Sequence, residues 1–457
     1  MRDQALRRRI KGWMMFDWAS QPFYTLLVTF LFGPYFVTVA TDAFLPTAGS
    51  EDAAKANAQS LWSLGQTVSG LCIAASAPLL GAFADTTGRR MPWIIFFSVL
   101  YVFGAASVWW LTPDGSLLVG ALIAFGVAFI GIEFATIFTN SMLPNLGPQR
   151  VIGRISGNGY AVGYVGGVLS LAVMLVFFVA VPGTAATIVG LAPLFGLDPE
   201  FGQDMRFAGP FAAVWYLVFM VPFFLWIREP RRTVPPGQFK AAVDSLLASL
   251  RGVFHSRSLA AYLVGSMFYR DALAALYGFG GTYAVLVLDW GAIQLLIFGV
   301  LAAVGAAIFS WIGGFADRNL GPKPVIVFCI FVLIGSCLAL VSTSREAFVG
   351  MPLSEGSALP DIILYVVGTA IGSAGGVLQA SSRTMMVRHA KPERPTEAFG
   401  LYALSGKATA FLGPALIGAV TYLTGSVRLG IAPLIFLFLL GLLLLVWVHP
   451  KGIRAEP

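Results

Sequence analysis

The chain alternates between long apolar runs and short polar or basic turns along its whole length. Most runs exceed the ~20 residues that an α-helix needs to cross a bilayer. Because a spanning backbone must satisfy its own hydrogen bonds, runs this long are expected to be helices. The pattern predicts twelve transmembrane helices, at residues 13–40, 60–84, 91–111, 116–141, 155–181, 209–227, 259–288, 290–316, 323–343, 359–386, 396–424 and 427–448.

Two polar turns repeat one another. The segment 81–90, GAFADTTGRR, follows the second run, and 313–323, GGFADRNLGPK, follows the eighth, 232 residues later. A repeat at this spacing in an apolar chain indicates two homologous membrane halves. We therefore expect six-helix bundles at 1–228 and 259–457, joined by a cytoplasmic central loop at 229–258. Part of that loop, 239–254, is either an amphipathic helix on the membrane face or a plain tether.

Composition and charge fit a membrane protein. Charged residues make up 11% of the chain and mean hydropathy is +0.81, whereas soluble domains have roughly 25% charged residues. With the N-terminus in the cytoplasm, 22 of the 29 Lys and Arg fall on the cytoplasmic side and four on the outer side, which is a strong positive-inside bias. This accounts for the basic net charge without nucleic acid. We expect a monomer in a bacterial inner membrane, both termini cytoplasmic, with its basic tail near lipid headgroups.

Signatures of soluble enzymes are absent from the sequence. It holds no Walker A lysine loop for ATP-driven pumping. The three histidines are scattered over cytoplasmic edges, and the three cysteines sit singly within spans. We therefore expect no enzyme activity, cofactor, metal site or disulfide.

Several segments together resemble the major facilitator superfamily. The polar turn with Gly81, Asp85, Gly88, Arg89 and Arg90, and its partial copy, carry the resemblance to the superfamily. The branch is indicated by WMMFDWA at 13–19, SMLP at 141–144, GRISG at 153–157, FYRD at 268–271, GLYALSGKA at 400–408 and FLGP at 411–414. These are similar to the unknown major facilitators, which include autophagy-related vacuolar amino-acid effluxers. Members often carry Asn where this chain has Arg270 and Ser20, and a change at either position can alter the substrate.

Charged residues inside spans are the candidate substrate or coupling residues. An ionisable group at the bilayer centre costs at least ~2.5 kcal/mol on insertion scales, so its default interpretation is functional. The resemblance places helices 1, 4, 7 and 10 around an aqueous cavity with helix 11 beside it. The candidates are Asp17, Glu133, Arg270, Asp271 and Lys407. Glu133 is the leading candidate for carrying a proton, Asp17 also fits a cytoplasmic gate, and the alternative for all five is an ion-pair network that only joins the halves.

The repeated turns are the candidate conformational gate: Asp85, Gly88, Arg89, Arg90 and Asp317. The resemblance implies that Asp85 holds the two halves together in the outward-open state, through contacts near helix 11. Thr396 is a candidate cap for that helix, whose N-terminus attracts negative charge. The arginines also fit simple topology. Asn140, Gln379 and Arg383 are expected to stabilise the gate from nearby.

The favoured function is secondary transport of a small zwitterion, such as an amino acid or derivative, because carboxylates and cations in one cavity can pair with both of its ends. One alternative is export of amphipathic drugs or lysolipids over the aromatic surfaces of the spans. Another, of a different class, is a receptor or scaffold that transports nothing. The exact substrate, the direction and the coupling ion, whether proton, sodium or none, stay open.

Overall fold

The computed structural model describes residues 2–181, 183–229, 244, 247–248, 251, 253, 255–354 and 356–452. Most of the predicted central loop, and of the helix considered at 239–254, lies outside the described residues. Up to residue 229 the elements are α1 (Arg2–Pro22), η1 (Phe23–Phe30), α2 (Phe32–Ala48), α3 (Glu51–Thr87), α4 (Met91–Ser107), η2 (Val108–Trp110), α5 (Leu118–Asn140), η3 (Leu143–Leu146), α6 (Gln149–Phe177), η4 (Leu194–Gly196), α7 (Gln203–Arg206) and α8 (Ala208–Trp226).

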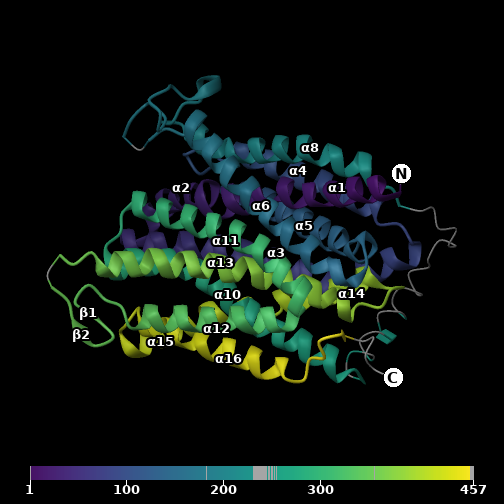
Figure 1. Ribbon diagram of the computed structural model, residues 1–457. Coiled ribbons are helices and arrows are strands. Elements are labelled where there is room, and N and C mark those ends of the chain that lie inside the picture. The colour runs from purple at the N-terminus through teal and green to yellow at the C-terminus, as the bar shows by residue number, and fades with distance from the viewer. Residues whose placement is uncertain are drawn as a thin grey trace. The chain divides into compact units, whose positions relative to one another are not determined.

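The second part of the chain is also helical apart from one small hairpin. Its elements are α10 (Arg257–Leu288), α11 (Ala292–Leu320), α12 (Pro322–Val341), β1 (Ala347–Phe348), β2 (Met351–Pro352), α13 (Leu359–His389), α14 (Pro395–Lys407), α15 (Leu412–Thr424), η5 (Leu429–Ile431) and α16 (Ala432–Leu445). Figure 1 shows α11 and α13 running alongside one another, and these two helices are in extensive contact.

The helices agree with most of the predicted spans. Among the described residues, eleven helical stretches are long and apolar enough to cross a membrane, and the shorter apolar stretch Leu429–Leu445 matches the predicted span at 427–448. Two spans differ from expectation. The first runs from Gln4 to Ala48 and contains the π-helical turn η1. The eleventh is interrupted between Lys407 and Leu412.

Both irregular spans have a proline just after the irregularity. A proline lacks an N–H group, and its ring clashes with the carbonyl four residues earlier. Pro34 lies four residues after Phe30, where η1 ends, and Pro414 lies four residues after Ala410 in the interruption of span eleven. Prolines near helix ends are common, so the hydropathy pattern alone gave no sign that these two would break their spans.

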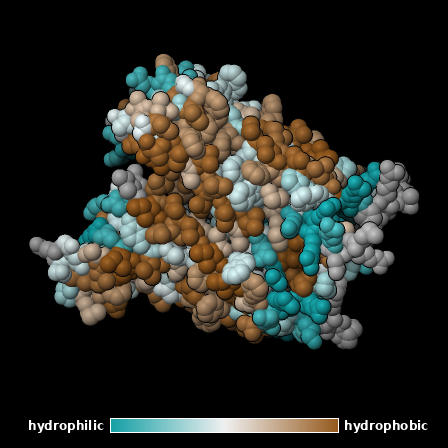
Figure 2. All heavy atoms as spheres, turned by 45° about the horizontal axis from the view of Figure 1, so that its top comes forward, coloured by the Kyte–Doolittle hydropathy of each residue, from teal (hydrophilic) through white to brown (hydrophobic). Residues whose placement is uncertain are grey.

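Large apolar side chains lie exposed on the outside of the helices. Phe103 and Phe328 are each 68% exposed, and Ile123 is 63% exposed. In Figure 2, apolar side chains cover much of the visible face and hydrophilic ones gather toward its margins. Such broad apolar surface is unfavourable in water, so these positions are suited to contact with lipid.

The chain divides into two compact units. Unit 1 comprises Met1–Ile73, Arg89–Thr139 and Val162–Arg232, and unit 2 comprises Ala74–Gly88, Asn140–Ala161 and Thr233–Pro457. Unit 2 therefore contains the end of α3 and the beginning of α6, which belong by sequence to the first half of the chain. These two segments pack on helices from the second half.

Small residues and aromatic rings hold each unit together. In unit 1 a Cβ built on Gly131 would lie 2.5 Å from the backbone nitrogen of Tyr101, so α4 and α5 touch backbone to backbone. Phe23 stacks on Phe125 at 5.6 Å between ring centres. In unit 2 the Tyr262 hydroxyl donates to the carbonyl of Ser382 at 2.6 Å, which ties α10 to α13. Small-residue contacts are the usual means of close helix packing where lipid removes the hydrophobic driving force.

Candidate functional site

The carboxylate of Asp85, near the end of α3, lies at the beginning of α14. Its Oδ2 accepts a hydrogen bond from the backbone nitrogen of Glu397 at 2.8 Å. A carboxylate is favoured there because the first N–H groups of a helix lack partners within the helix and carry partial positive charge. The expected cap by Thr396 is wrong: Arg394 occupies the N-cap position without a side-chain bond. The Thr396 hydroxyl instead donates to Ser141 Oγ at 3.2 Å.

Glycines on both helices let α3 and α14 approach this closely. A Cβ built on Gly81 would lie 2.7 Å from the carbonyl oxygen of Thr396, and one built on Gly400 would lie 2.5 Å from that of Ala77. Neither distance leaves room for a side chain. Gly88 ends α3 with φ +66°, in the left-handed region that glycine adopts at little cost. The glycines of the first repeated turn thus fit a backbone contact and a helix stop.

The two arginines after Gly88 lie in unit 1. Arg89 is exposed and Arg90 partly buried. The backbone nitrogens of Arg90 and Met91 donate to the carboxylate of Glu229 at 2.9–3.0 Å. Glu229 therefore satisfies the N-terminus of α4. Sequence reasoning missed it, because Glu229 lies 138 residues from Met91 at a predicted loop boundary.

The copy of the turn is packed against α6. Asp317 is only 2% exposed. A Cβ built on Gly153 would lie 2.5 Å from Asp317 Cγ, and one on Gly157 would lie 2.6 Å from Gly314 Cα. Arg154 lies over the ring of Phe315 at 4.8 Å. The GRISG segment is therefore the surface on which the second turn rests.

Arg383 on α13 makes the richest set of polar contacts in this region. It is 2% exposed. Its Nε donates to Ser156 Oγ at 2.9 Å, its Nη2 to the Ser156 carbonyl at 2.8 Å and its Nη1 to Asn140 Oδ1 at 3.1 Å. Ser156 Oγ in turn donates to the carbonyl of Ala380 at 2.8 Å, and the guanidinium lies 4.4 Å from the ring of Tyr160. One buried cation thus joins α5 and α6 to α13.

The contacts of Asp85, Asp317, Arg383 and the closely packed glycines all lie in unit 2. Each of them nevertheless joins the first half of the sequence to the second. We call them the half-to-half interface, made up of Gly81, Asp85, Asn140, Ser141, Gly153, Ser156, Gly157, Gly314, Asp317, Arg383, Thr396, Glu397 and Gly400. It includes the predicted gate residues Asp85 and Asp317. It excludes Arg89 and Arg90, which belong to unit 1.

Three of the predicted substrate or coupling residues lie around the interruption of span eleven. The Arg270 guanidinium donates to the carbonyl of Tyr402 at 2.9 Å and lies 3.9 Å from its ring centre. A Cβ on Gly406 would meet that guanidinium at 2.5 Å. Asp271 Oδ2 accepts from the backbone nitrogen of Gly413 at 3.1 Å. Lys407 is the last residue of α14.

The other two candidates lie in unit 1. Tyr24, within η1, donates its hydroxyl to Glu133 Oε1 at 3.2 Å, so the π-helical turn faces the carboxylate. π-Helical turns are frequent at functional sites. A Cβ built on Gly163 would lie 3.1 Å from the backbone carbonyl of Asp17, which brings α6 close to α1. The five candidates are thus divided between the units, with Asp17 and Glu133 in unit 1 and Arg270, Asp271 and Lys407 in unit 2.

A match to a known family gives this architecture its context. The model for the family described as "Vacuole effluxer Atg22 like" matches residues 5–456. The chain belongs to this Atg22-like family. One relative is the "Uncharacterized MFS-type transporter YxiO" of Bacillus subtilis (strain 168), 24% identical over 451 residues, which cover 96% of this chain and 94% of YxiO. Autophagy-related protein 22 of Cryptococcus neoformans is 25% identical over 301 residues, 64% of this chain and 48% of the fungal protein.

Solved structures establish the fold of this Atg22-like chain. The human organic anion transporter MFSD10 superposes with a TM-score of 0.69 at 16% identity, over 96% of this chain and 99% of MFSD10. The proton:xylose symporter XylE gives 0.67 at 13% identity, over 99% and 98%. The predicted all-α major facilitator fold is confirmed. The chain is a multi-pass membrane transporter for small molecules, and its family and fold are not those of enzymes.

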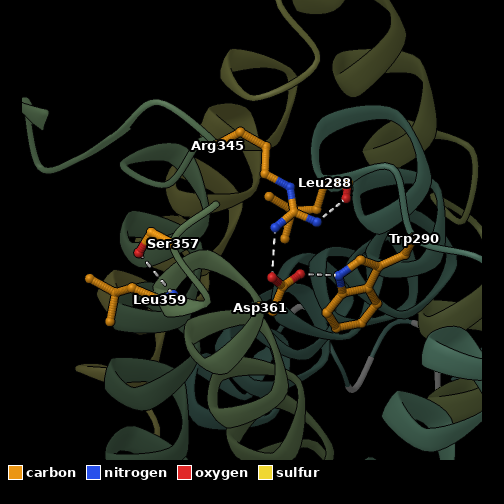
Figure 3. A network of polar contacts seen from close by, with 6 residues as sticks. All are labelled: Leu288, Trp290, Arg345, Ser357, Leu359 and Asp361. Carbon is orange, nitrogen blue, oxygen red and sulfur yellow. Dashed lines mark hydrogen bonds and ion pairs between the residues drawn. The ribbon is translucent and has the colours of Figure 1, made fainter. Parts of the chain in front are cut away.

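A second polar network, which was not predicted from the sequence, lies where α13 begins (Figure 3). Asp361 pairs with Arg345 at 2.6 Å and accepts from Trp290 Nε1 at 2.5 Å. Arg345 also donates to the carbonyl of Leu288. These residues join the end of α10, the approach to α11, the loop after α12 and the beginning of α13, all within the second half. We call them the α13-start network.

The described ranges hold no group of three or more His, Cys, Asp or Glu that could bind a metal ion. Cys72 is exposed, while Cys329 and Cys337 are buried, and all three are free thiols.

Proposed function

We propose that this protein is a secondary active transporter that moves a small zwitterionic metabolite, an amino acid or a derivative, by alternating access as a monomer. The Atg22-like family supports a transport role, since its description names a vacuole effluxer, and the zwitterionic substrate class rests on the charged side chains described below. The proposed halves are 1–228 and 259–457 around a cytoplasmic central loop at 229–258. With both termini in the cytoplasm, the half-to-half interface is the cytoplasmic gate in its closed state.

The observation that carries the proposal is how the half-to-half interface is built. Gly157 and Gly314 meet with no room for a Cβ, and Asp85 accepts a hydrogen bond from the backbone nitrogen of Glu397 at the beginning of α14. Hydrogen bonds of this kind contribute about 0.5–1.5 kcal/mol each. Such contacts fit only one closed arrangement, but they are weak enough to separate in a transport cycle.

The candidate residues include both the negative and the positive charges that would pair with the two ends of a zwitterion. Glu133 with Tyr24 is the proposed acidic element in unit 1 and the proposed proton carrier. Arg270 and Lys407 are the proposed partners of the substrate's anionic end. Arg270 donates one N–H to the carbonyl of Tyr402. Because a guanidinium has five N–H donors, substrate can bind without breaking the hydrogen bond to Tyr402.

The test is flux and stability measured together. The purified protein in proteoliposomes is offered a mixture of labelled amino acids under a proton gradient, and accumulated compounds are identified by mass spectrometry. Glu133→Gln should abolish accumulation but retain counterflow, because counterflow needs no net proton movement. Arg270→Gln and Lys407→Gln should weaken binding. If all three variants lose thermal stability in proportion to flux, the charges are structural and the proposed site is wrong.

A second candidate substrate class rests on the rings beside Asp17. Trp18 stacks on Trp215 at 5.8 Å between ring centres and meets Phe219 at 5.5 Å. An aromatic surface of this kind also suits an amphipathic drug or lysolipid. Uptake of labelled lysolipid that is lost in Trp18→Ala, with no amino-acid flux, would favour this class. Absence of all flux would favour a receptor or scaffold.

A further inference from the structure

The interruption of span eleven leaves two helix ends facing residues 408–411. α14 ends at Lys407 and α15 begins at Leu412. Pro414 has no N–H to donate, which favours a stop before it. The end of α14 therefore carries partial negative charge and the beginning of α15 partial positive charge.

Arg270 and Asp271, which are adjacent on α10, contact α14 and α15 respectively. Arg270 donates to the carbonyl of Tyr402 in the last turns of α14, at 2.9 Å. Asp271 accepts from Gly413 at the beginning of α15, at 3.1 Å. Asp271 thus places a negative charge at the positive end of α15, while Arg270 binds α14 before its last turn. The two neighbouring charges contact opposite sides of the turn at 408–411.

The carboxylate of Asp271 is nevertheless incompletely satisfied. The residue is 2% exposed. Its Oδ1 is buried and has no hydrogen-bond partner among the described residues, and the same holds for Oγ1 of Thr409, one turn before Gly413. An ionised carboxylate removed from water needs a partner for its charge. A buried carboxylate with one oxygen bonded to the beginning of α15 and the other oxygen without a hydrogen bond therefore points to a bound cation.

The surrounding charges do not supply that cation. α10 is packed against α13, α14, α15 and α16. Apart from tyrosines, the titratable side chains on these four helices are Asp361, Arg383, Arg388, His389, Glu397 and Lys407, with none on α15 or α16. Of the described residues, only Gly413 is bonded to Asp271. Arg270, on α10 itself, faces Tyr402.

We propose that Asp271 and the interruption at 408–411 form a site for a small monovalent cation, Na⁺ or H⁺, with Thr409 as a second oxygen ligand when the cation is Na⁺. Interrupted transporter helices commonly coordinate such ions, and hard cations prefer oxygen ligands. Occupancy neutralises Asp271 and sets how firmly α10 holds the beginning of α15. Only the link to transport rests on the proposed function, because binding is measured without substrate.

Unit 1 contains a residue that serves as a matched control. Asp204 is as buried as Asp271, at 3% exposed, but both of its oxygens are satisfied. Oδ2 accepts from the backbone nitrogen of Ala180 at 3.2 Å and Oδ1 from that of Met205 at 2.8 Å. Asp204→Asn should therefore change stability without changing any response to cations.

The experiment has two arms on the full-length purified protein. The first is thermal unfolding at constant ionic strength while NaCl replaces choline chloride. The second is infrared difference spectroscopy of the carboxylic-acid band during a pH titration. For a Na⁺ site, Tm should rise by about 2 °C, Asp271→Asn should abolish the rise, and Thr409→Val should require about tenfold more Na⁺.

For a proton site, Na⁺ has no effect, and the wild type shows a titrating carboxylic band that is absent in Asp271→Asn and present in Asp204→Asn and Thr409→Val. If Asp271→Asn does not fold, the wild type and Thr409→Val still decide the Na⁺ arm, and Asp271→Glu decides the proton arm through a shifted band. A wild type with neither a Na⁺ response nor a titrating band from position 271 overturns the proposal, even if amino-acid transport is observed.

Discussion

Helices α11 and α13 have different contacts at their two ends. Where α13 begins, the α13-start network ties neighbouring helices of one half through the Arg345–Asp361 ion pair and the Trp290 N–H. Toward the other ends of these helices, the contacts are with residues 140–157 of the first half: Asp317 packs against Gly153, and Arg383 donates hydrogen bonds to Ser156 and Asn140.

In the proposed transport cycle, this difference separates contacts that persist from contacts that break. The α13-start network joins elements that move together if each half is a rigid body, as in rocking mechanisms of alternating access. The half-to-half interface joins elements that part in the proposed cycle. Its glycine contacts are selective because one methyl group blocks them, and reversible because each stabilises the closed state only slightly.

The largest effect on interface opening and transport is expected from Gly157→Ala. Its Cβ would lie 2.6 Å from Gly314 Cα, and overpacking of this kind costs about 1–3 kcal/mol. The interface should open, and transport should fall about tenfold or more. Accessibility is measured as maleimide labelling of Thr396→Cys, in a background without the three native cysteines, because Thr396 is fully buried when the interface is closed.

Gly335→Ala is the matched control, because a Cβ on Gly335 meets nothing within 4 Å. It should leave labelling and transport unchanged. Equal labelling of Thr396→Cys in the Gly157→Ala and Gly335→Ala backgrounds would mean that the glycine contact does not hold the interface closed.

Arg383→Gln should have the next largest effect. The cation donates hydrogen bonds to Ser156 and Asn140. Glutamine loses the charge but keeps N–H donors that can replace part of these bonds, so the expected loss is that of one bond to a charged group, about 1.5–3 kcal/mol, without the steric clash that Gly157→Ala introduces. The interface should open while the rest of unit 2 stays folded. Thermal unfolding with the Thr396→Cys labelling assay separates the two effects. A large fall in Tm without increased labelling would show that Arg383 stabilises the fold rather than the closed state.

Asp85→Asn should have a smaller effect in the same direction. The amide can still accept a hydrogen bond from Glu397, but the attraction between charge and helix end, typically 0.3–1 kcal/mol, is lost. Spin-label distances across the interface should show a larger open population with unchanged helix content. Identical distance distributions in wild type and Asp85→Asn would contradict a gate role for this carboxylate.

Asp361→Asn should have the smallest effect. The side chains of Arg345 and Asp361 are 39% and 30% exposed, and exposed pairs contribute about 0.2–1 kcal/mol. A slight fall in Tm is expected, with unchanged flux and unchanged labelling of Thr396→Cys. Increased labelling would mean that the two ends of α13 are coupled, so that the network is not merely a link within one half.

The sequence predicted the spans well because a membrane imposes one requirement on every residue of a helix. α8 and α10 begin and end within two residues of their predicted spans. The interruption at 408–411 was missed because Pro414 in an apolar run is compatible with a continuous helix and with a broken one. The contacts on either side of the interruption come from Arg270 and Asp271, which are 132 and 142 residues from their partners Tyr402 and Gly413 in sequence.

The candidate residues could be identified from the sequence, but the partners that they contact could not. Charges such as Glu133 and Asp271 stand out in apolar runs because burial makes them costly. Their partners do not stand out: Tyr24, Tyr402 and Gly413 are ordinary membrane residues, and two of the three contacts use the partner's backbone. Backbone partners leave no signature in a sequence, which is also why the cap was wrongly assigned to Thr396.

The claim that the half-to-half interface opens and closes during transport is tested most directly by a reversible lock. Ser141 Oγ and Thr396 Oγ1 lie 3.2 Å apart, so cysteines at both positions can form a disulfide with little movement. In proteoliposomes, oxidised Ser141→Cys/Thr396→Cys should lose transport and dithiothreitol should restore it, while either single variant is insensitive to oxidant. Full transport by the protein carrying this disulfide, with the bond verified by mass spectrometry, would contradict the claim.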